Sequence, residues 1–114
     1  MNSILVNKPW GYFEQFTHNQ NSTVKLLYIK KGESLSLQYH NNRIEFWKII
    51  SGQPFVEIGE IKTEAKPGDE FEIQKLIQHR ISAPKDDVVF LEISMGEFDE
   101  EDIVRVEDKY SRVK

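Results

Sequence analysis

Residues 32–52 read GESLSLQYHNNRIEFWKIISG, and this stretch indicates both the fold and the chemistry of the chain. Apolar runs enclose a short polar segment whose chemically distinctive members are Gln38, His40, Arg43 and Glu45. Alternate residues of a β-strand share one face, so Gln38 and His40 point the same way, as Glu45 and Trp47 do in the next run. If the two runs are neighbouring strands with those faces inward, the amide, the imidazole and the carboxylate converge inside the protein.

Short apolar runs separated by turn signals continue along the rest of the chain. The pattern predicts seven strands, at Val24–Ile29, Ser34–His40, Glu45–Ser51, Phe55–Ile58, Glu70–Ile73, His79–Ala83 and Val88–Ser94. Between two of them, Lys66-Pro67-Gly68-Asp69 carries Pro and Gly at the positions that a type II turn favours. Only residues 98–110 rival this pattern, because that segment is compatible with a short helix or with a strand. The strand spacing predicts an all-β sandwich or barrel.

Composition narrows the class of protein. A chain of 114 residues forms one domain, which we place at residues 1–114. The absence of cysteine excludes disulfides and thiolate metal sites. A net charge of −4 without a basic block argues against a nucleic-acid partner. The sequence shows no signal peptide and no apolar run long enough to span a membrane, so we expect a cytoplasmic protein without a membrane partner.

A second histidine extends the polar cluster, because His79 opens the predicted strand HRISA. An amide oxygen, two imidazoles and a carboxylate suit a divalent metal ion with open positions for substrate, and here they come from Gln38, His40, Glu45 and His79. Each donor alone is better explained as a hydrogen-bonded residue at a strand end, but the four together favour a metal site. An unpaired buried Glu45 would cost several kcal/mol or become protonated, and a cation resolves this. Zinc is the metal we expect, with manganese, iron, cobalt or nickel as alternatives.

The spacing of these donors resembles the two-part motif of the cupin superfamily. The first half reads Gly32, five residues, Gln38-x-His40, four residues, Glu45, six residues, Gly52, with glutamine in place of the first histidine. The second half reads Gly68, five residues, Gln74-x-Leu76, two residues, His79, and departs from the motif at Gln74, Leu76 and Ala83. The resemblance implies a single cupin domain, which is a double-stranded β-helix or jelly-roll barrel.

The stretch at residues 32–52 also looks like the signature of one cupin family, the type II mannose-6-phosphate isomerases. That domain is often the C-terminal part of a bifunctional enzyme with mannose-1-phosphate guanylyltransferase. Three more stretches agree with it: KPWGYFE at 8–14, VKLLYIKKGESLSLQ at 24–38 and EISMGEFDEEDIVRVEDKYSR at 92–112. The chain departs from the family where Asn41 and Asn42 replace a run of histidines, and where Tyr110-Ser111-Arg112 replaces Tyr-Gly-Arg.

This resemblance implies a stand-alone, metal-dependent aldose–ketose isomerase that interconverts mannose 6-phosphate and fructose 6-phosphate through an enediol. Two alternatives stay open: a cupin that acts on another phosphorylated or nucleotide-linked sugar, and a non-catalytic sugar-phosphate-binding module. Such a module would partner a separately encoded guanylyltransferase. Analogy with other cupin-like barrels further implies a homodimer that pairs through an edge strand.

Four more residues are candidates for binding or catalysis. Lys25 shares a strand face with apolar residues and, with Arg105, is a candidate catalytic cation. Arg43 suits a sugar phosphate and Trp47 suits the sugar ring, so both are candidate substrate contacts. The alternatives are a surface charge for Arg43, core packing for Trp47, and a solvated charged tail for Arg105 and Glu92. A further aromatic residue, Trp10, is expected to anchor the N-terminal segment against the barrel.

Overall fold

The computed structural model describes residues 3–110 and 112, and within them it contains β-strands and no helix. The strands are β1 (Ile4–Lys8), β2 (Gly11–Gln15), β3 (Ser22–Ile29), β4 (Leu37–Tyr39), β5 (Glu45–Ser51), β6 (Phe55–Ile58), β7 (Ile61–Glu64), β8 (Glu70–Ile73), β9 (His79–Ser82), β10 (Val88–Met95) and β11 (Val104–Glu107). This confirms the all-β prediction.

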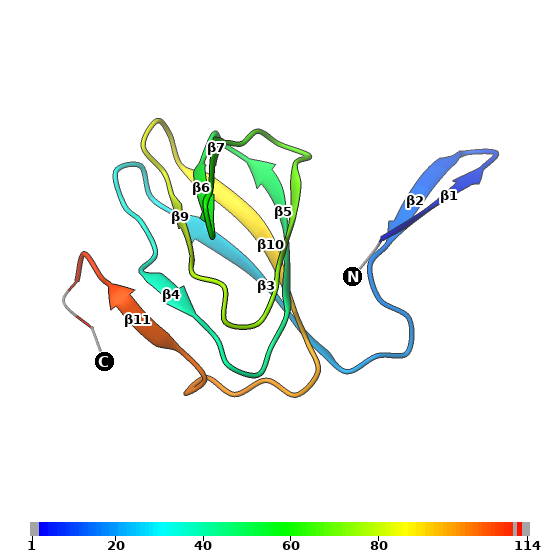
Figure 1. Ribbon diagram of the computed structural model, residues 1–114. Helices are drawn as coiled ribbons and strands as arrows, with labels where there is room; N and C mark the ends of the chain where they lie inside the picture. The colour runs from blue at the N-terminus through cyan, green and yellow to red at the C-terminus, as the bar shows by residue number, and fades with distance from the viewer. Residues whose placement is uncertain (1–2, 111, 113–114) are drawn as a thin grey trace.

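Two antiparallel sheets face each other and form a jelly roll (Figure 1). One sheet has the strand order β3-β10-β5-β8, and the other has the order β11-β4-β9-β6-β7. The order is non-sequential because, from β3 to β11, successive strands alternate between the sheets except for the β6–β7 hairpin. Residues from distant parts of the sequence therefore meet in the space between the two sheets.

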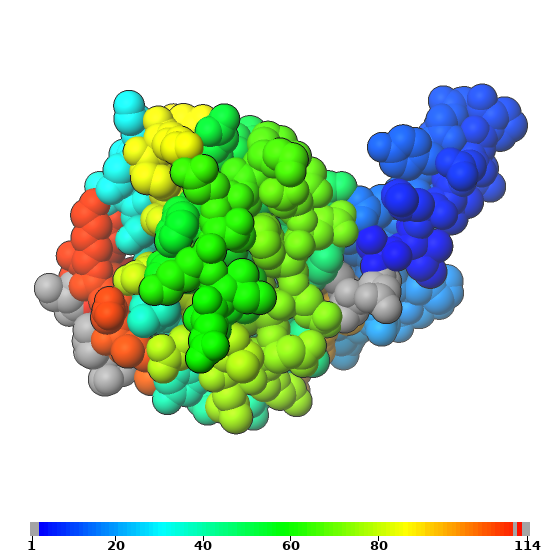
Figure 2. Space-filling view, turned by 45° about the horizontal axis from the view of Figure 1, so that its top comes forward, coloured from blue at the N-terminus to red at the C-terminus, as the bar shows by residue number. Residues whose placement is uncertain are grey.

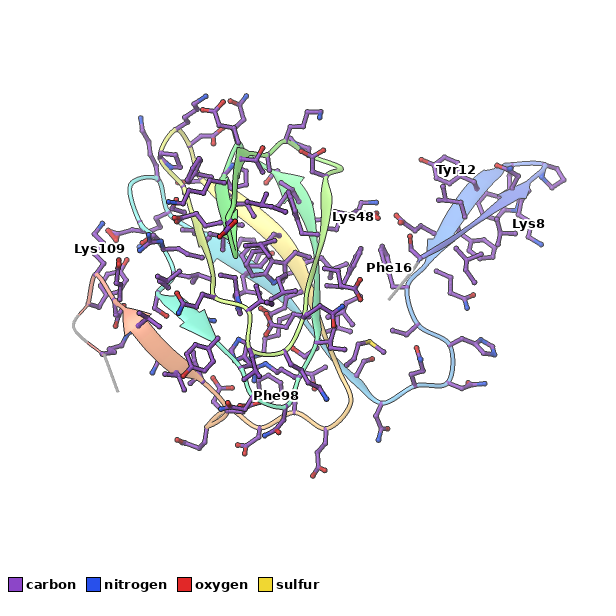
Figure 3. All side chains as sticks on the ribbon, in the orientation of Figure 1. Lys8, Tyr12, Phe16, Lys48, Phe98 and Lys109 are labelled. Atoms are coloured by element: carbon purple, nitrogen blue, oxygen red, sulfur yellow. The ribbon has the colours of Figure 1, made fainter. Side chains whose placement is uncertain are left out.

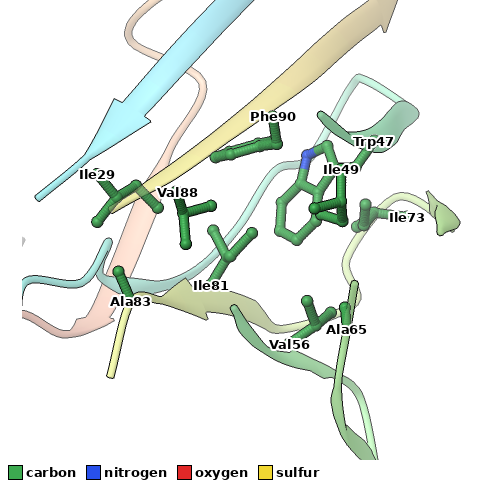
Figure 4. Close-up of a cluster of buried hydrophobic side chains, with 10 residues drawn as sticks. All are labelled: Ile29, Trp47, Ile49, Val56, Ala65, Ile73, Ile81, Ala83, Val88 and Phe90. Carbon is green, nitrogen blue, oxygen red and sulfur yellow. The ribbon is translucent and has the colours of Figure 1, made fainter. Parts of the chain in front are cut away.

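The hydrophobic core lies in that space (Figure 4). The inward faces of β5 and β10 contribute Trp47, Ile49 and Phe90, each at most 1% exposed. Ile81 of β9 and Val56 of β6 pack against them from the other sheet. The inward-facing polar residues lie to one side of the apolar ones along these strands, since Glu45 precedes Trp47, His79 precedes Ile81 and Glu92 follows Phe90.

A glycine at the end of β5 allows two chain segments to approach closely. Gly52 has φ +86°, and a Cβ built on it would lie well inside van der Waals contact with the Asp87 carbonyl oxygen. We expect Gly52→Ala to lower the free energy of unfolding by about 2–4 kcal/mol, from left-handed strain plus the clash. Gly68→Ala is the matched control, because Gly68 has φ +95° but nothing within 4 Å. Urea unfolding of both variants tests this, and equal losses would contradict the close approach.

Several elements differ from the expectations. The predicted strand at Ser34–His40 is shorter, since only Leu37–Tyr39 is continuous and Ser34 makes an isolated bridge to Ser82. The undecided segment at 98–110 contains strand β11, which pairs with β4. Strands β1, β2 and β7 were not predicted. They expose most of their side chains, so they lack the apolar alternation that marks a half-buried strand.

Strands β1 and β2 form a separate hairpin that projects from the body of the molecule (Figure 2). Trp10 lies at its turn and is 73% exposed, so the prediction that Trp10 anchors the N-terminal segment is wrong. The base of the hairpin makes the contact instead: Phe16 packs on Phe46 with ring centroids 5.4 Å apart, and Glu14 pairs with Lys48 (Figure 3). This explains why Phe46, on the outer face of β5, is buried.

Candidate metal centre

Three strands position the polar cluster between the sheets. Gln38 lies on β4 and His40 follows that strand directly, while Glu45 begins β5 and His79 begins β9. Gln38 and His79 are partners in the β4–β9 register. Strands from separate parts of the sequence therefore place these side chains close together between the sheets, as the spacing of the motif predicted.

The ligand atoms of His40, Glu45 and His79 lie within 4.8 Å of one another. His40 Nε2 is 3.3 Å from Glu45 Oε2, and His79 Nε2 is 3.8 Å from Glu45 Oε1. All three residues are at most 2% exposed. Two imidazoles and a carboxylate at this separation surround a space of the size that one metal ion needs.

Backbone carbonyl groups fix the tautomers of both histidines. His40 Nδ1 lies 2.6 Å from the Asp102 carbonyl oxygen, and His79 Nδ1 lies 2.8 Å from that of Ile77. Since a carbonyl oxygen only accepts, Nδ1 carries the proton and the Nε2 lone pair points to the cluster. Burial lowers the pKa of both histidines, which keeps the rings neutral and able to bind a cation.

Two buried atoms of the cluster lack a hydrogen-bond partner within the described part of the chain. They are Glu45 Oε1 and His79 Nε2, and each faces the other. Buried polar atoms are nearly always partnered, so an unpaired facing pair of acceptors is what a missing cation would leave. The residues present therefore fit a divalent metal ion.

Gln38 lies next to this cluster as the fourth candidate ligand. Its Nε2 is 3.4 Å from His40 Nε2, and its Oε1 accepts a hydrogen bond of 2.6 Å from Ser36 Oγ. Rotation of the amide by 180° would turn Oε1 to the cluster, and Ser36 Oγ could then accept from Nε2. Gln38 is thus placed to complete the set that the sequence predicted.

Arg43 is buried beside the cluster rather than exposed on the surface. Its Nε donates to Glu45 Oε2 at 2.9 Å, and its Nη1 donates to the Asp99 carbonyl oxygen at 3.1 Å. The guanidinium thus compensates the charge of Glu45 and links β5 to the segment after β10. The surface-charge alternative is wrong for this residue, while contact with a substrate phosphate stays a prediction.

Trp47 belongs to the core. It is 1% exposed and packs edge-on against Phe90 at 5.2 Å and against His79 at 5.6 Å between ring centroids. This position agrees with the core-packing alternative and supports the ring of one candidate ligand. A contact between Trp47 and a sugar stays a prediction.

The segment between β10 and β11 closes the polar end of the sandwich. Phe98 lies at that end (Figure 3), with Lys25 Nζ 4.3 Å and Arg43 Cζ 4.5 Å from its ring centroid. The Asp102 carboxylate accepts hydrogen bonds from the backbone N–H groups of Asn41 and Asn42, at 2.8 and 2.9 Å. The segment therefore holds the loop that carries His40.

The stability of the loop that carries His40 should depend on pH through the Asp102 carboxylate. Burial alone would raise the pKa of Asp102, but the N–H donors of Asn41 and Asn42 and the nearby His40 and Arg43 lower it below the ordinary value. Its stabilisation is therefore complete above the unfolded pKa of about 3.9 and is lost as pH falls through the lower folded value. We expect Asp102→Asn to cost about 1–3 kcal/mol at neutral pH, because an amide leaves one donor unpaired.

Unfolding of wild type and Asp102→Asn in urea, measured at neutral pH and again at about pH 3, tests this coupling. The difference between the two proteins should shrink in acid. A difference that stays constant with pH would show that the Asp102 carboxylate does not carry the effect.

The two candidate catalytic cations lie on edge strands of opposite sheets. Arg105 of β11 is the register partner of Gln38, and its buried Nε has no hydrogen-bond partner among the described residues. Lys25 of β3 is the register partner of Glu92, and its Nζ is 3.6 Å from Glu100 Oε2. The solvated-tail alternative is therefore wrong for Arg105, whose side chain is half-buried.

Sequence reasoning missed Glu92. The sequence places Glu92 in a predicted strand but offers only a solvated charged tail for its carboxylate, yet it is only 7% exposed, on the inward face of β10. The signal was present in the alternation of Val88, Phe90 and Glu92, since a strand that buries the first two turns the third to the same side. Burial, reinforced by the charge of Glu45, raises the pKa of Glu92 to about 7.

A jelly roll that encloses a histidine–glutamate–histidine cluster defines a cupin. A cupin protein from Bacteroides fragilis has the same fold, with a TM-score of 0.60 and 24% identity over 68% of this chain and 70% of that one. The family model described as Mannose-6-phosphate isomerase C-terminal matches residues 2–108. The chain belongs to this family.

Two curated relatives illustrate the family. The xanthan biosynthesis protein XanB of Xanthomonas campestris pv. campestris is 35% identical over 109 residues, which cover 94% of this chain. The mannose-1-phosphate guanylyltransferase ManC of Salmonella typhimurium is 33% identical over 111 residues, which cover 95% of this chain. The chain spans 23% of the length of each relative.

The part of the chain that the structure describes contains no helix that could span a membrane.

Proposed function

We propose that the chain is a metal-dependent aldose–ketose isomerase that interconverts mannose 6-phosphate and fructose 6-phosphate. Family membership supports a sugar-related activity. The observation that carries the proposal is the pair of buried, unpartnered acceptors, Glu45 Oε1 and His79 Nε2, in a cluster of neutral histidines. Such a pair is costly in a protein that binds no cation there.

Gln38, His40, Glu45 and His79 would hold the metal, and their nitrogen and oxygen donors suit zinc. When bound, a divalent ion supplies Lewis-acid polarisation of the sugar carbonyl group. The carbonyl groups of Asp102 and Ile77 keep the imidazole rings in the tautomer that binding requires.

Lys25 and Arg105 are proposed to bind the phosphate group. Both belong to edge strands, and both have register partners among the inward-facing polar residues. Arginine forms paired hydrogen bonds with phosphate oxygens, and lysine adds a mobile positive charge. The unpartnered Nε of Arg105 supports this assignment, because a phosphate oxygen would satisfy it.

The loss of the histidine run at Asn41 and Asn42 does not argue against catalysis. The backbone N–H groups of both residues bind Asp102, and both side chains lie on the exposed side of the loop. Homodimer formation through an edge strand and partnership with a separately encoded guanylyltransferase stay predictions, and neither is required by the proposed reaction.

A coupled assay that detects fructose 6-phosphate tests the function. Metal-loaded protein should convert mannose 6-phosphate, while equal concentrations of other hexose 6-phosphates should give little product. Turnover of a different sugar phosphate would replace the substrate assignment. Tight binding of mannose 6-phosphate without turnover, under any divalent metal, would identify a non-catalytic binding module and overturn the proposal.

A further inference from the structure

One buried carboxyl group is not used by the metal centre. Glu92 is a member of the inward face of β10, between the core residue Phe90 and Ser94. The nearby Arg43, Lys25 and Trp47 side chains favour its charged form, and it is not among the residues whose ligand atoms cluster within 4.8 Å. Carboxyl groups are rarely buried, so this position calls for a functional explanation.

Strand register places Glu92 close to the metal centre. Its partners are Lys25 on β3 and Trp47 on β5. The Trp47 ring packs against the ring of His79 in the opposite sheet, with centroids 5.6 Å apart. One side chain therefore separates Glu92 from the candidate ligand His79, and the charge of a second candidate ligand, Glu45, acts on the Glu92 carboxyl group.

Lys25, Glu92 and Trp47 form a row across three neighbouring strands of one sheet. The opposite sheet has a corresponding row, formed by Arg105, Gln38 and His79. Gln38 is in register with His79 on one side and with Arg105 on the other. Each row thus joins an edge-strand cation to the Trp47–His79 contact, Lys25 through Glu92 in one sheet and Arg105 through Gln38 in the other.

The charges around Glu92 favour a group that can hold or release a proton. The groups that act on it are Lys25 from β3, Glu45 and the Trp47 side chain from β5, and Arg43 from the loop before β5. Burial and the charge of Glu45 raise the pKa of Glu92 to about 7, while Arg43 and Lys25 act in the opposite direction. A group with a pKa near the working pH serves both as base and as acid.

We propose that Glu92 is the catalytic acid–base group of the isomerisation, an inference that rests on the proposed function. The Glu92 carboxylate takes the proton from C2 of the aldose, and the electrons of the broken C2–H bond form the C1=C2 double bond. The oxygen on C1 gains a proton, and the hydroxyl group on C2 loses one. The protonated Glu92 exchanges its proton with solvent and then delivers one to C1, while the proton lost from the C2 hydroxyl group balances the proton gained by the oxygen on C1, so the ketose forms without any net change in protons.

Glu92→Gln tests this role, because it preserves the size of the side chain and removes the base. We expect kcat for mannose 6-phosphate to fall by about 10²- to 10⁴-fold. Metal stoichiometry and the Kd for mannose 6-phosphate, both measured by calorimetry, should change by less than about threefold, since Glu92 is not a ligand. Glu60→Gln, at an exposed carboxylate in the turn between β6 and β7, is the control.

Two further measurements separate proton transfer from a structural role. In D₂O, wild-type protein should place deuterium at C1 of fructose 6-phosphate, and Glu92→Gln should not. Added formate should restore part of the turnover of Glu92→Ala, because it can occupy the vacated space. If Glu92→Gln keeps kcat within about tenfold of wild type, or loses metal or sugar binding in parallel with kcat, the acid–base role is wrong.

The activity of the wild-type protein distinguishes a failure of the proposed function from a failure of the Glu92 proposal. If metal-loaded wild-type protein turns over no mannose 6-phosphate and exchanges no C1 or C2 proton, the isomerase proposal falls and the Glu92 proposal falls with it. If wild type is active and only the expected effect of Glu92→Gln is missing, the isomerase proposal stands and another group moves the proton.

Discussion

His79→Ala should bind zinc more than about 100-fold more weakly than wild type and should lose metal-dependent turnover. Even residues that only orient a ligand change metal affinity by about 10- to 100-fold, and a ligand should contribute more. His79 Nε2 is buried, has no hydrogen-bond partner among the described residues and faces Glu45 Oε1. Its removal therefore takes one nitrogen ligand away from the metal ion. Competition with a coloured chelator measures the affinity.

His18→Ala is the matched control, because His18 lies in an exposed loop, where its ring forms a hydrogen bond with the side chain of its neighbour Asn19. It should bind zinc as wild type does. Equal affinities for His79→Ala and His18→Ala would show that the cluster of His40, Glu45 and His79 is not the metal site.

Trp47→Ala should lower the free energy of unfolding by about 3–5 kcal/mol, because it deletes the largest side chain of the core. Trp47 packs against Phe90 and His79, and the space between rigid sheets cannot collapse to fill the vacancy. Urea unfolding of metal-free protein measures this loss without a contribution from metal binding.

The second tryptophan provides the comparison. Trp10 is 73% exposed at the hairpin turn, so Trp10→Ala should change stability by no more than about 0.5 kcal/mol. A loss for Trp10→Ala that approaches that of Trp47→Ala would mean that the hairpin packs on the body, and the description of a projecting hairpin would be wrong.

The ligand positions and the central strands could be predicted from two local features of the sequence. These are the apolar runs that end at turn residues and the spacing of the polar donor residues. Glu45–Ser51, Phe55–Ile58 and Glu70–Ile73 have the predicted bounds, since each joins an apolar run to a turn residue. The spacing of Gln38, His40 and Glu45 constrains which faces meet. Alternation then brings the three side chains together once the strands enter facing sheets.

Elements held by backbone pairing or by a few contacts could not be predicted. The hairpin exposes Ile4, Leu5 and Tyr12, so its apolar residues do not mark a buried face. Strand β11 pairs with β4 at the edge of a sheet, where its charged residues remain partly in solvent. Glu92 was misplaced because a carboxylate in an acidic stretch is normally solvated, and only its alternation with Phe90 contradicts this.

The most direct measurement is turnover of mannose 6-phosphate by chelator-stripped protein as zinc, manganese or cobalt is added back. If Gln38, His40, Glu45 and His79 hold a catalytic ion, the stripped protein is inactive, and activity rises until one ion is bound per chain. Full activity after stripping, or no activity at one bound ion of any of these metals, would contradict a metal-dependent isomerase.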